Sequence, residues 1–209
     1  ASEAFSAGRI DEAIGFVTTA LKEKPEEAAL HNDLGVYYLS QRTFEQAEAA
    51  FGKAVELSPR YVKAFYNLGT LYLKQGLAGK ALRPLERALE LQPYYTEAHY
   101  NLAQALARLG ETSRAIEEYK TVARINRTPA FAKAYYNMGV LFMEQNKLQK
   151  ALDAFKRTLR RRADYVKVRY NMAILLRRLG LLDQAEQQYG RVLQLEPNHT
   201  RALVNLGAL

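Results

Sequence analysis

Hydrophobic positions along the chain recur with the spacing expected on one face of an α-helix. They fall into segments of helical length, and short polar stretches separate each segment from the next. Several of these stretches contain a glycine or an asparagine, namely Gly76, Gly110, Asn146 and Gly180. These residue types tolerate the left-handed backbone on which many helices end. The pattern therefore predicts an all-α chain in which helices are paired through tight turns.

The paired segments repeat along the whole chain. A tripeptide of Asn or Asp, an apolar residue and Gly or Ala recurs at Asp33, Asn67, Asn101, Asn137, Asn171 and Asn205. The spacing of its Gly or Ala is 34 residues, except for one step of 36 between Ala103 and Gly139. A fixed period of this length indicates stacked repeats. We expect a single array over residues 1–209, with full units at 28–61, 62–95, 96–131, 132–165 and 166–199 and partial units at 1–27 and 200–209.

Two columns of small residues and one of bulky residues hold at the same period. The first is always alanine: Ala13, Ala47, Ala81, Ala115, Ala151 and Ala185. The second is Ala20, Ala54, Ala88, Val122, Thr158 and Val192, and the bulky column between them is Phe51, Leu85, Tyr119, Phe155 and Tyr189. Two helices approach closely only where their crossing carries small side chains, and bulky neighbours then fill the gap. One hairpin cannot bury its apolar face alone, so the units must stack.

These columns resemble the signature of the tetratricopeptide repeat family, which is W-x2-L-G-x2-Y, then A-x3-F, then P. Unit 62–95 carries Phe65, Leu68, Gly69 and Tyr72, then Ala81 and Leu85, then Pro93. The first signature position departs throughout, since His31, Phe65, His99, Tyr135, Arg169 and Leu203 replace the tryptophan. The resemblance implies a right-handed superhelical α-solenoid of helix-turn-helix units that acts as a protein-interaction scaffold. Helical-hairpin arrays that bind RNA have a similar period but fit these columns less well.

Three local irregularities stand out against the repeat. Unit 96–131 is two residues too long around Asn126–Pro129, where Thr128 is expected to cap the next helix and Pro129 to open it. Pro84 lies inside a predicted second helix and is expected to bend it. Arg161, within an Arg160–Arg162 run, takes the column of Leu57, Leu91, Ile125 and Leu195. We favour a basic cap at a helix end for this run, the alternative being a second basic patch for an acidic partner.

Composition excludes several classes of function. The chain has no cysteine, and its three histidines lack the spacing of metal ligands. No phosphate loop, nucleophile elbow or paired-carboxylate constellation is present, so we predict no enzyme activity, no metal and no cofactor. No apolar run reaches the roughly 18 residues that cross a bilayer, and no signal peptide is recognised, which favours the cytoplasm without determining the compartment.

Charge is unevenly distributed along the chain. The formal net charge is +8, with −1 over residues 1–95 and +9 over residues 96–209. A basic half favours an acidic partner.

In repeats of the family that the chain resembles, the first helix of each unit lines a concave groove. Three kinds of groove-facing residue follow from that orientation: an asparagine column, a tyrosine column and several basic positions. The expected peptide-binding residues are Lys63, Tyr66, Asn67, Lys74, Tyr100, Asn101, Arg108, Lys133, Tyr136, Asn137, Lys167, Tyr170, Asn171, Arg177 and Arg178.

Each residue type in this set suits an extended polypeptide. An amide side chain offers a donor and an acceptor to a peptide unit, so a regular row of them holds a backbone without reading its sequence. Tyrosine supplies rigid contact area with a hydroxyl. The cations in these columns outnumber the carboxylates, which favours an acidic peptide or protein surface as the partner. The alternative for the asparagines and tyrosines is packing between units.

Two other functions stay open at this point. The apolar residues of the partial end units, among them Leu203, Leu206 and Leu209, favour self-assembly by stacking between chains. The basic half favours nucleic acid more weakly, and that mode predicts a steep loss of affinity with added salt.

The small column generates a stability prediction. Ala115→Leu or Ala151→Leu should overpack the helix crossing and lower the free energy of unfolding by about 1–3 kcal/mol. Urea unfolding followed by circular dichroism measures the loss. Variants that melt like the parent would contradict the assignment of this column to the crossing.

Overall fold

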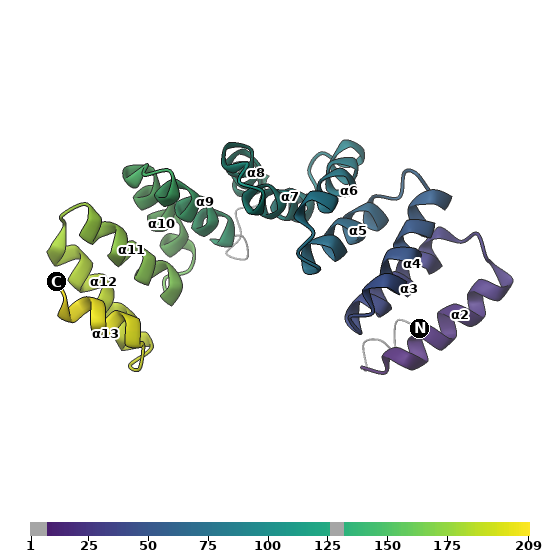
Figure 1. Ribbon diagram of the computed structural model, residues 1–209, viewed down its shortest axis with the longest axis horizontal. Helices are drawn as coiled ribbons and strands as arrows, with labels where there is room; N and C mark the ends of the chain where they lie inside the picture. Colours follow the sequence, from purple (N-terminus) through teal and green to yellow (C-terminus); the bar gives the residue numbers. More distant parts are fainter. Residues whose placement is uncertain (1–7, 126–131) are drawn as a thin grey trace. The chain divides into compact units, whose positions relative to one another are not determined.

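The computed structural model describes residues 8–125 and 132–209 of the chain, and within these ranges all regular secondary structure is helical (Figure 1). Contacts group the chain into two compact units, Ala1–Glu111 and Thr112–Leu209. The first holds α2 (Ile10–Glu23), α3 (Ala28–Ser40), α4 (Phe44–Leu57), α5 (Val62–Lys74), α6 (Ala78–Leu91) and α7 (Thr96–Arg108). The second holds α8 (Thr112–Ile125), α9 (Ala132–Glu144), α10 (Leu148–Arg161), α11 (Val166–Arg178), α12 (Leu182–Leu195) and α13 (Thr200–Gly207).

The helices begin where the repeat predicts. Each full repeat starts with a helix of 13 residues and continues with one of 14, as α5 and α6 do in the repeat 62–95. Within each compact unit the two helices of a repeat lie side by side, which Figure 1 shows for α3 with α4 and for α11 with α12. The all-α fold of helix-turn-helix repeats is thereby confirmed. A single array over 1–209 stays a prediction, because the boundary between the two compact units falls between α7 and α8.

The predicted turn residues take the left-handed backbone. Gly76, Gly110 and Gly180 have φ values of 79°, 79° and 74°, and Asn146 has 56°. Beyond Gly76 the amide of Leu77 donates to the carbonyl of Tyr72 at 2.9 Å, which satisfies an acceptor at the end of α5. The pattern missed two members of this set: Gly8, with φ 76°, and Arg42, with φ 62°, which ends α3 in the same way.

The small and bulky columns form the core. Every alanine of the first column, from Ala13 to Ala185, has zero exposed surface. In the bulky column Phe51, Leu85, Phe155 and Tyr189 are likewise fully buried, and Tyr119 is 2% exposed. Thr158 is the polar member of the second column, and its hydroxyl donates to the Ala154 carbonyl at 3.0 Å.

Three glycines of the repeated tripeptide lie directly under the bulky column. A Cβ atom added at Gly35 would lie 2.6 Å from the Phe51 ring, and one added at Gly139 would lie 2.4 Å from the Phe155 ring. At Gly69 the same atom would lie 2.5 Å from Leu85. The two helices of these repeats therefore approach as closely as a bare backbone allows.

The irregularities of the sequence have different outcomes. Pro84 lies inside α6, as predicted, and the helix continues past it to Leu91; the expected bend stays a prediction. Six residues connect α8 to α9, against four between α4 and α5, so the two extra residues belong to this connection. The expected cap at Thr128 and opening at Pro129 lie outside the described residues.

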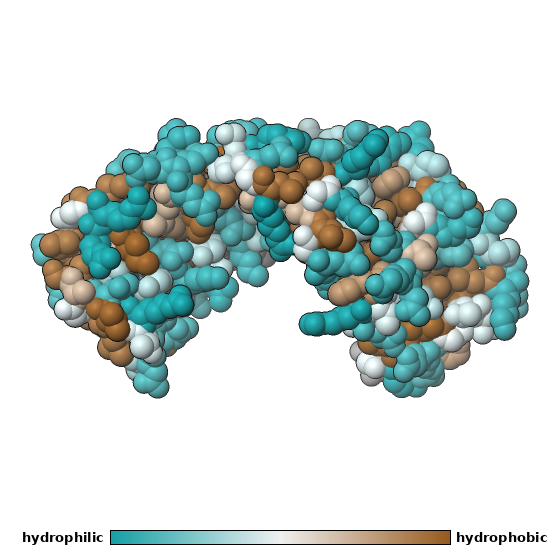
Figure 2. Space-filling model, viewed as in Figure 1, coloured by the Kyte–Doolittle hydropathy of each residue, from teal (hydrophilic) through white to brown (hydrophobic). Residues whose placement is uncertain are grey.

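Exposed apolar side chains gather on α13. Leu203 is 50% exposed and Val204 is 65% exposed. Figure 2 shows a hydrophobic area at the place that α13 occupies in Figure 1, and hydrophilic surface beside it.

Gly139 offers a test of the close approach. Gly139→Ala should lower the free energy of unfolding by about 1–3 kcal/mol, because the new methyl group meets the fully buried Phe155 ring. Urea unfolding measures the change. Gly190 is the matched control, since it also lies inside a helix but has open space at its Cβ position. Gly190→Ala should raise stability by about 0.8–1 kcal/mol through helix propensity alone. Equal effects of the two substitutions would contradict the packing account.

Candidate functional site

The predicted peptide-binding residues divide by exposure. Within the compact unit Ala1–Glu111, Lys63, Lys74 and Arg108 are exposed, whereas the tyrosines and asparagines of α5 and α7 are half-buried. Within Thr112–Leu209, Lys133, Lys167, Arg177 and Arg178 are exposed, and the tyrosines and asparagines of α9 and α11 are half-buried. The basic side chains thus reach solvent, and the neutral ones form the layer beneath them.

The asparagine column links neighbouring repeats. In the first unit the amide nitrogen of Asn67 donates to Oδ1 of Asn32 at 2.8 Å, and that of Asn101 donates to Oγ1 of Thr70 at 2.9 Å. In the second unit the Asn171 amide nitrogen donates to the hydroxyl of Tyr136 at 3.1 Å. One N–H of each amide thus serves the stacking of repeats, which leaves the second N–H and the amide oxygen for other partners.

Asn137 also bonds to a side chain of the preceding repeat. Its amide nitrogen donates to the hydroxyl of Tyr119 on α8 at 2.9 Å, and Tyr119 is 2% exposed. Asn205 donates in the same way as Asn171, to Tyr170 of the preceding first helix.

The tyrosine column packs against the connection that closes each repeat. The rings of Tyr66 and Tyr95 lie 4.9 Å apart between centroids, and those of Tyr136 and Tyr165 lie 5.6 Å apart. Burial, reinforced by Tyr66 and then Glu97, raises the pKa of Tyr95 to about 12. Burial also raises the pKa of Tyr136, although the hydrogen bond from Asn171 acts in the opposite direction. Both phenols are therefore neutral at physiological pH.

Several basic residues of the predicted set are anchored to the preceding repeat. Arg108 donates to the Leu73 carbonyl at 2.7 Å, near the end of α5. Arg178 donates to Oδ1 of Asn146 at 3.0 Å, in the turn after α9. The ammonium of Lys167 lies 5.9 Å from the centroid of the Tyr136 ring. A cation–π contact of this kind holds a charge over an aromatic face while it stays exposed.

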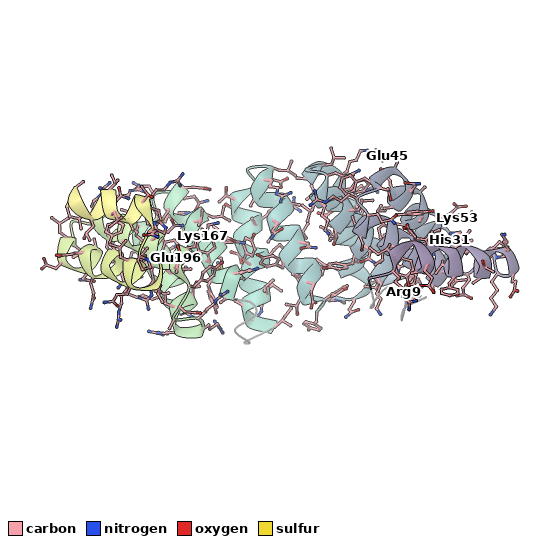
Figure 3. The ribbon with its side chains drawn as sticks, turned by 90° about the horizontal axis from the view of Figure 1, so that it is seen from below. Arg9, His31, Glu45, Lys53, Lys167 and Glu196 are labelled. Atoms are coloured by element: carbon pink, nitrogen blue, oxygen red, sulfur yellow. The ribbon has the colours of Figure 1, made fainter. Side chains whose placement is uncertain are left out.

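One hollow brings three of the predicted residues together. A cavity of about 300 Å³ is lined by Lys167, Tyr170 and Asn171 of α11 and by Val166, Glu196, His199 and Arg201. Figure 3 shows Lys167 beside Glu196. The His199 ring packs on Tyr170 with 5.0 Å between centroids. The predicted set lacks Val166, Glu196, His199 and Arg201. Glu196 and His199 come from the connection between α12 and α13 rather than from a first helix.

The side chain at the first signature position makes a hydrogen bond to the connection that precedes its helix. Nε2 of His31 lies 2.8 Å from the Pro25 carbonyl, and Nε2 of His99 lies 2.9 Å from the Pro93 carbonyl. A carbonyl only accepts, so each ring is protonated on Nε2. Nε of Arg169 donates to the Ala163 carbonyl at 2.9 Å in the same way. These side chains are structural, as expected for the two histidines.

Residues 8–125 and 132–209 contain neither a metal-binding cluster nor a helix that could cross a membrane. No group of three or more His, Asp or Glu side chains in this part could hold a metal ion. No helix there has the length and apolarity needed to cross a membrane.

Comparison with known proteins gives one family. Two models described as tetratricopeptide repeat match the chain, one at residues 1–62, 33–96, 66–128 and 100–166 and the other at residues 142–209. A search among curated proteins found no match.

Solved structures of the same fold accompany this family match. YrrB, described as a TPR protein with an unusual peptide-binding site, is 21% identical with a TM-score of 0.78, and the match covers 90% of this chain and 96% of that one. MamA is 23% identical with a TM-score of 0.75, covering 80% and 97%. PilF of Pseudomonas aeruginosa is 22% identical with a TM-score of 0.73, covering 87% and 82%.

The hydrogen bond between Asn171 and Tyr136 can be tested by a double-mutant cycle. Asn171→Ala and Tyr136→Phe should each lower the free energy of unfolding, and the combined variant should lose about 0.5–1.5 kcal/mol less than the sum. Urea unfolding of the four proteins gives the coupling. Additive losses would show that the amide does not stabilise the stacking of α9 and α11.

Proposed function

Because this chain belongs to the tetratricopeptide repeat family, whose members are in general non-catalytic interaction scaffolds, we propose that it captures an extended acidic segment of a protein partner. The segment lies along the exposed face of the first helices, the groove face of the family's repeats. The observation that carries the proposal is the hollow in which Lys167, Tyr170 and Asn171 converge. The role requires no catalytic residue and no cofactor.

The chemistry of this hollow suits a peptide backbone flanked by carboxylates. The hydroxyl of Tyr170 accepts a hydrogen bond from Asn205, so its own proton is available to a ligand carbonyl. The Asn171 amide donates one N–H to the hydroxyl of Tyr136, which orients its oxygen and its second N–H toward the carbonyl and N–H groups of a ligand backbone. Lys167 and Arg201 supply positive charge against one carboxylate, Glu196.

The exposed charges of the first helices α9 and α11 also favour an acidic partner. Lys133 of α9, Lys167 of α11 and the pair Arg177 and Arg178 are exposed on the predicted columns, against Glu144. Exposed charges of one sign accelerate encounter with the opposite charge and disfavour partners of like charge. An acidic partner therefore fits this face best.

Self-association is a second candidate, favoured by the exposed Leu203 and Val204 on α13. Light scattering over a range of concentrations distinguishes it from capture of a partner. Nucleic-acid binding is the third, and an oligonucleotide titration at low and moderate salt tests it through its salt dependence.

The proposed capture can be tested with peptides selected from a display library of random 12-residue sequences. We expect the peptides enriched on the native chain to be rich in Asp and Glu. Lys133→Glu with Lys167→Glu should weaken their binding at least ~10-fold, about 1.4 kcal/mol. Asn171→Ala should weaken it by a smaller factor, and fluorescence anisotropy measures both.

Lys53→Glu with Lys156→Glu is the matched control, because it changes the net charge by the same amount on second helices, at a Lys53 side chain that is 44% exposed and at the exposed Lys156. It should bind nearly as the parent does at 0.15 M salt, where charges more than ~8 Å apart are screened. Equal weakening by the two pairs would show a response to net charge only. Undiminished binding by the folded Lys133/Lys167 variant would refute the groove mechanism.

A further inference from the structure

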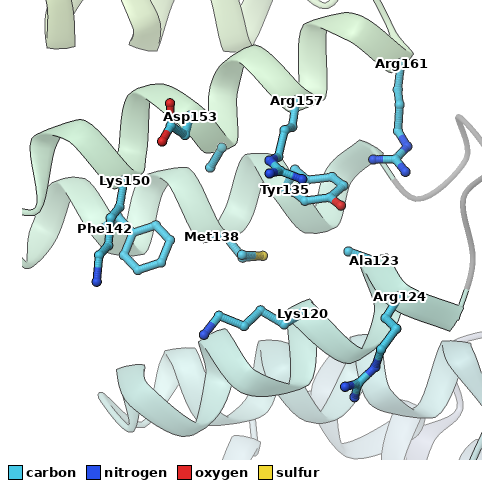
Figure 4. Close-up of a pocket in the computed structure, with 11 residues that line it drawn as sticks. Lys120, Ala123, Arg124, Tyr135, Met138, Phe142, Lys150, Asp153, Arg157 and Arg161 are labelled. Atoms are coloured by element: carbon cyan, nitrogen blue, oxygen red, sulfur yellow. The ribbon is translucent and has the colours of Figure 1, made fainter.

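The other side of α9 carries a second concentration of positive charge. At roughly 100° per residue, Tyr135, Met138 and Phe142 lie on the opposite side of the helix from Lys133 and Asn137. The three form one wall of a cavity of about 660 Å³ between α8, α9 and α10 (Figure 4). None of its lining residues belongs to the peptide-binding set predicted above.

The cavity has an apolar floor and a basic rim. Its floor includes Met138 and Phe142, which are 7% and 9% exposed, and the sulfur of Met138 points into the open space (Figure 4). Five cations line it, against the single carboxylate of Asp153. They are Lys120, Arg124, Lys150, Arg157 and Arg161. Lys120 also pairs with Glu117 at 2.7 Å, outside this lining.

Two of the arginines depart from their repeat columns. Arg161 stands where Leu57, Leu91 and Leu195 stand in other repeats. Arg124 stands where Glu56 and Glu90 stand. A basic residue in the last turn of a helix accounts for Arg160 and Arg161 on α10 and for Arg124 on α8, but it does not require that Arg124 and Arg161 line the same cavity. Both departures add positive charge to one cavity.

Two arginines of α10 lie over an aromatic ring of α9. The guanidinium carbons of Arg161 and Arg157 lie 4.7 Å and 5.9 Å from the centroid of the Tyr135 ring. Burial would raise the pKa of Tyr135, but hydrogen bonding and charge from Arg161 and Arg157 outweigh it and lower the pKa below its usual value. The interior of the cavity therefore favours negative charge.

The hollow is longer than a single anion requires. A second cavity of about 330 Å³ shares Lys120, Phe142 and Lys150 with it and extends to Ser113. From Ser113 to Arg124 the two follow α8 for about 16 Å, at 1.5 Å per residue. An extended chain covers that length with about five residues.

We propose that this hollow between α8, α9 and α10 binds a short acidic segment of a partner protein. One apolar side chain of the segment enters against Met138 and Phe142, and carboxylates on either side of it meet Arg124, Arg157 and Arg161. Apolar burial supplies affinity, and the bidentate geometry of arginine with carboxylates sets the register. The site is separate from the groove face proposed above, so each can fail without the other.

The chain's methionines allow a direct test. It has three, Met138, Met143 and Met172, and only Met138 lines the cavity. The full-length protein is labelled with ¹³C in the methionine methyl groups, and Met138→Leu assigns the signal. The probe is the capped peptide Glu-Glu-Leu-Phe-Glu-Glu at 0.15 M salt. We expect a saturable shift of the Met138 methyl signal, larger than that of Met143 or Met172.

Two control peptides separate the contributions of charge and apolar contact. Glu-Glu-Gly-Gly-Glu-Glu and Gln-Gln-Leu-Phe-Gln-Gln should each bind at least tenfold more weakly than the probe. Equal binding of the charge-only peptide would mean general attraction to a basic surface and would overturn the proposal. So would a saturable shift of Met172 without one of Met138, or no shift at 1 mM peptide.

Arg161→Leu is the decisive variant, because leucine is the residue that this column carries in three other repeats. It should keep the stability of the fold and weaken binding of the probe at least tenfold. Arg160→Leu makes the same change at the preceding, exposed position and should bind as the parent does. Lys133→Glu with Lys167→Glu should leave the Met138 shift in place. Undiminished binding by folded Arg161→Leu would overturn the proposal.

Discussion

The close contact between the two helices of a repeat is the constraint on which the rest of this structure depends. Gly35, Gly69 and Gly139 let Phe51, Leu85 and Phe155 lie within van der Waals reach of a bare helix backbone. A bulky side chain fits there only if its opposite residue has none. Once this contact is made, each helix has one face packed on its partner helix and another packed on the next repeat. Positions that belong to neither face remain exposed.

Those remaining positions carry the candidate recognition chemistry. The tyrosines and asparagines of the first helices take part in stacking and also border solvent, as Tyr136 does when it accepts from Asn171 and lies under Lys167. In the proposed groove, stacking and recognition would use the same hydrogen-bonded row. A ligand there would meet groups whose orientation the neighbouring repeat already holds, which reduces the entropy lost on binding.

The connection between α8 and α9 is two residues longer than the other connections between repeats. The cavity of about 660 Å³ lies between α8, α9 and α10, with basic residues around an apolar floor. The junction that departs from the period therefore lies beside the second proposed binding surface.

The sequence by itself determined the repeats, the helix starts, the turns at Gly76 and Asn146, and the buried columns, since each depends on local spacing or on a residue type at a fixed period. It also placed Lys167, Tyr170 and Asn171 on one face of α11. Only the tertiary structure decided which partners the side chains meet: Asn67 donates to Asn32, Asn171 to Tyr136 and Asn137 to Tyr119. It also brought Arg157 and Arg161 over the ring of Tyr135. The repeat period indicates which face of its helix a residue occupies. The contacts of that residue depend on the distance between neighbouring helices, and side chains distant in the chain set that distance.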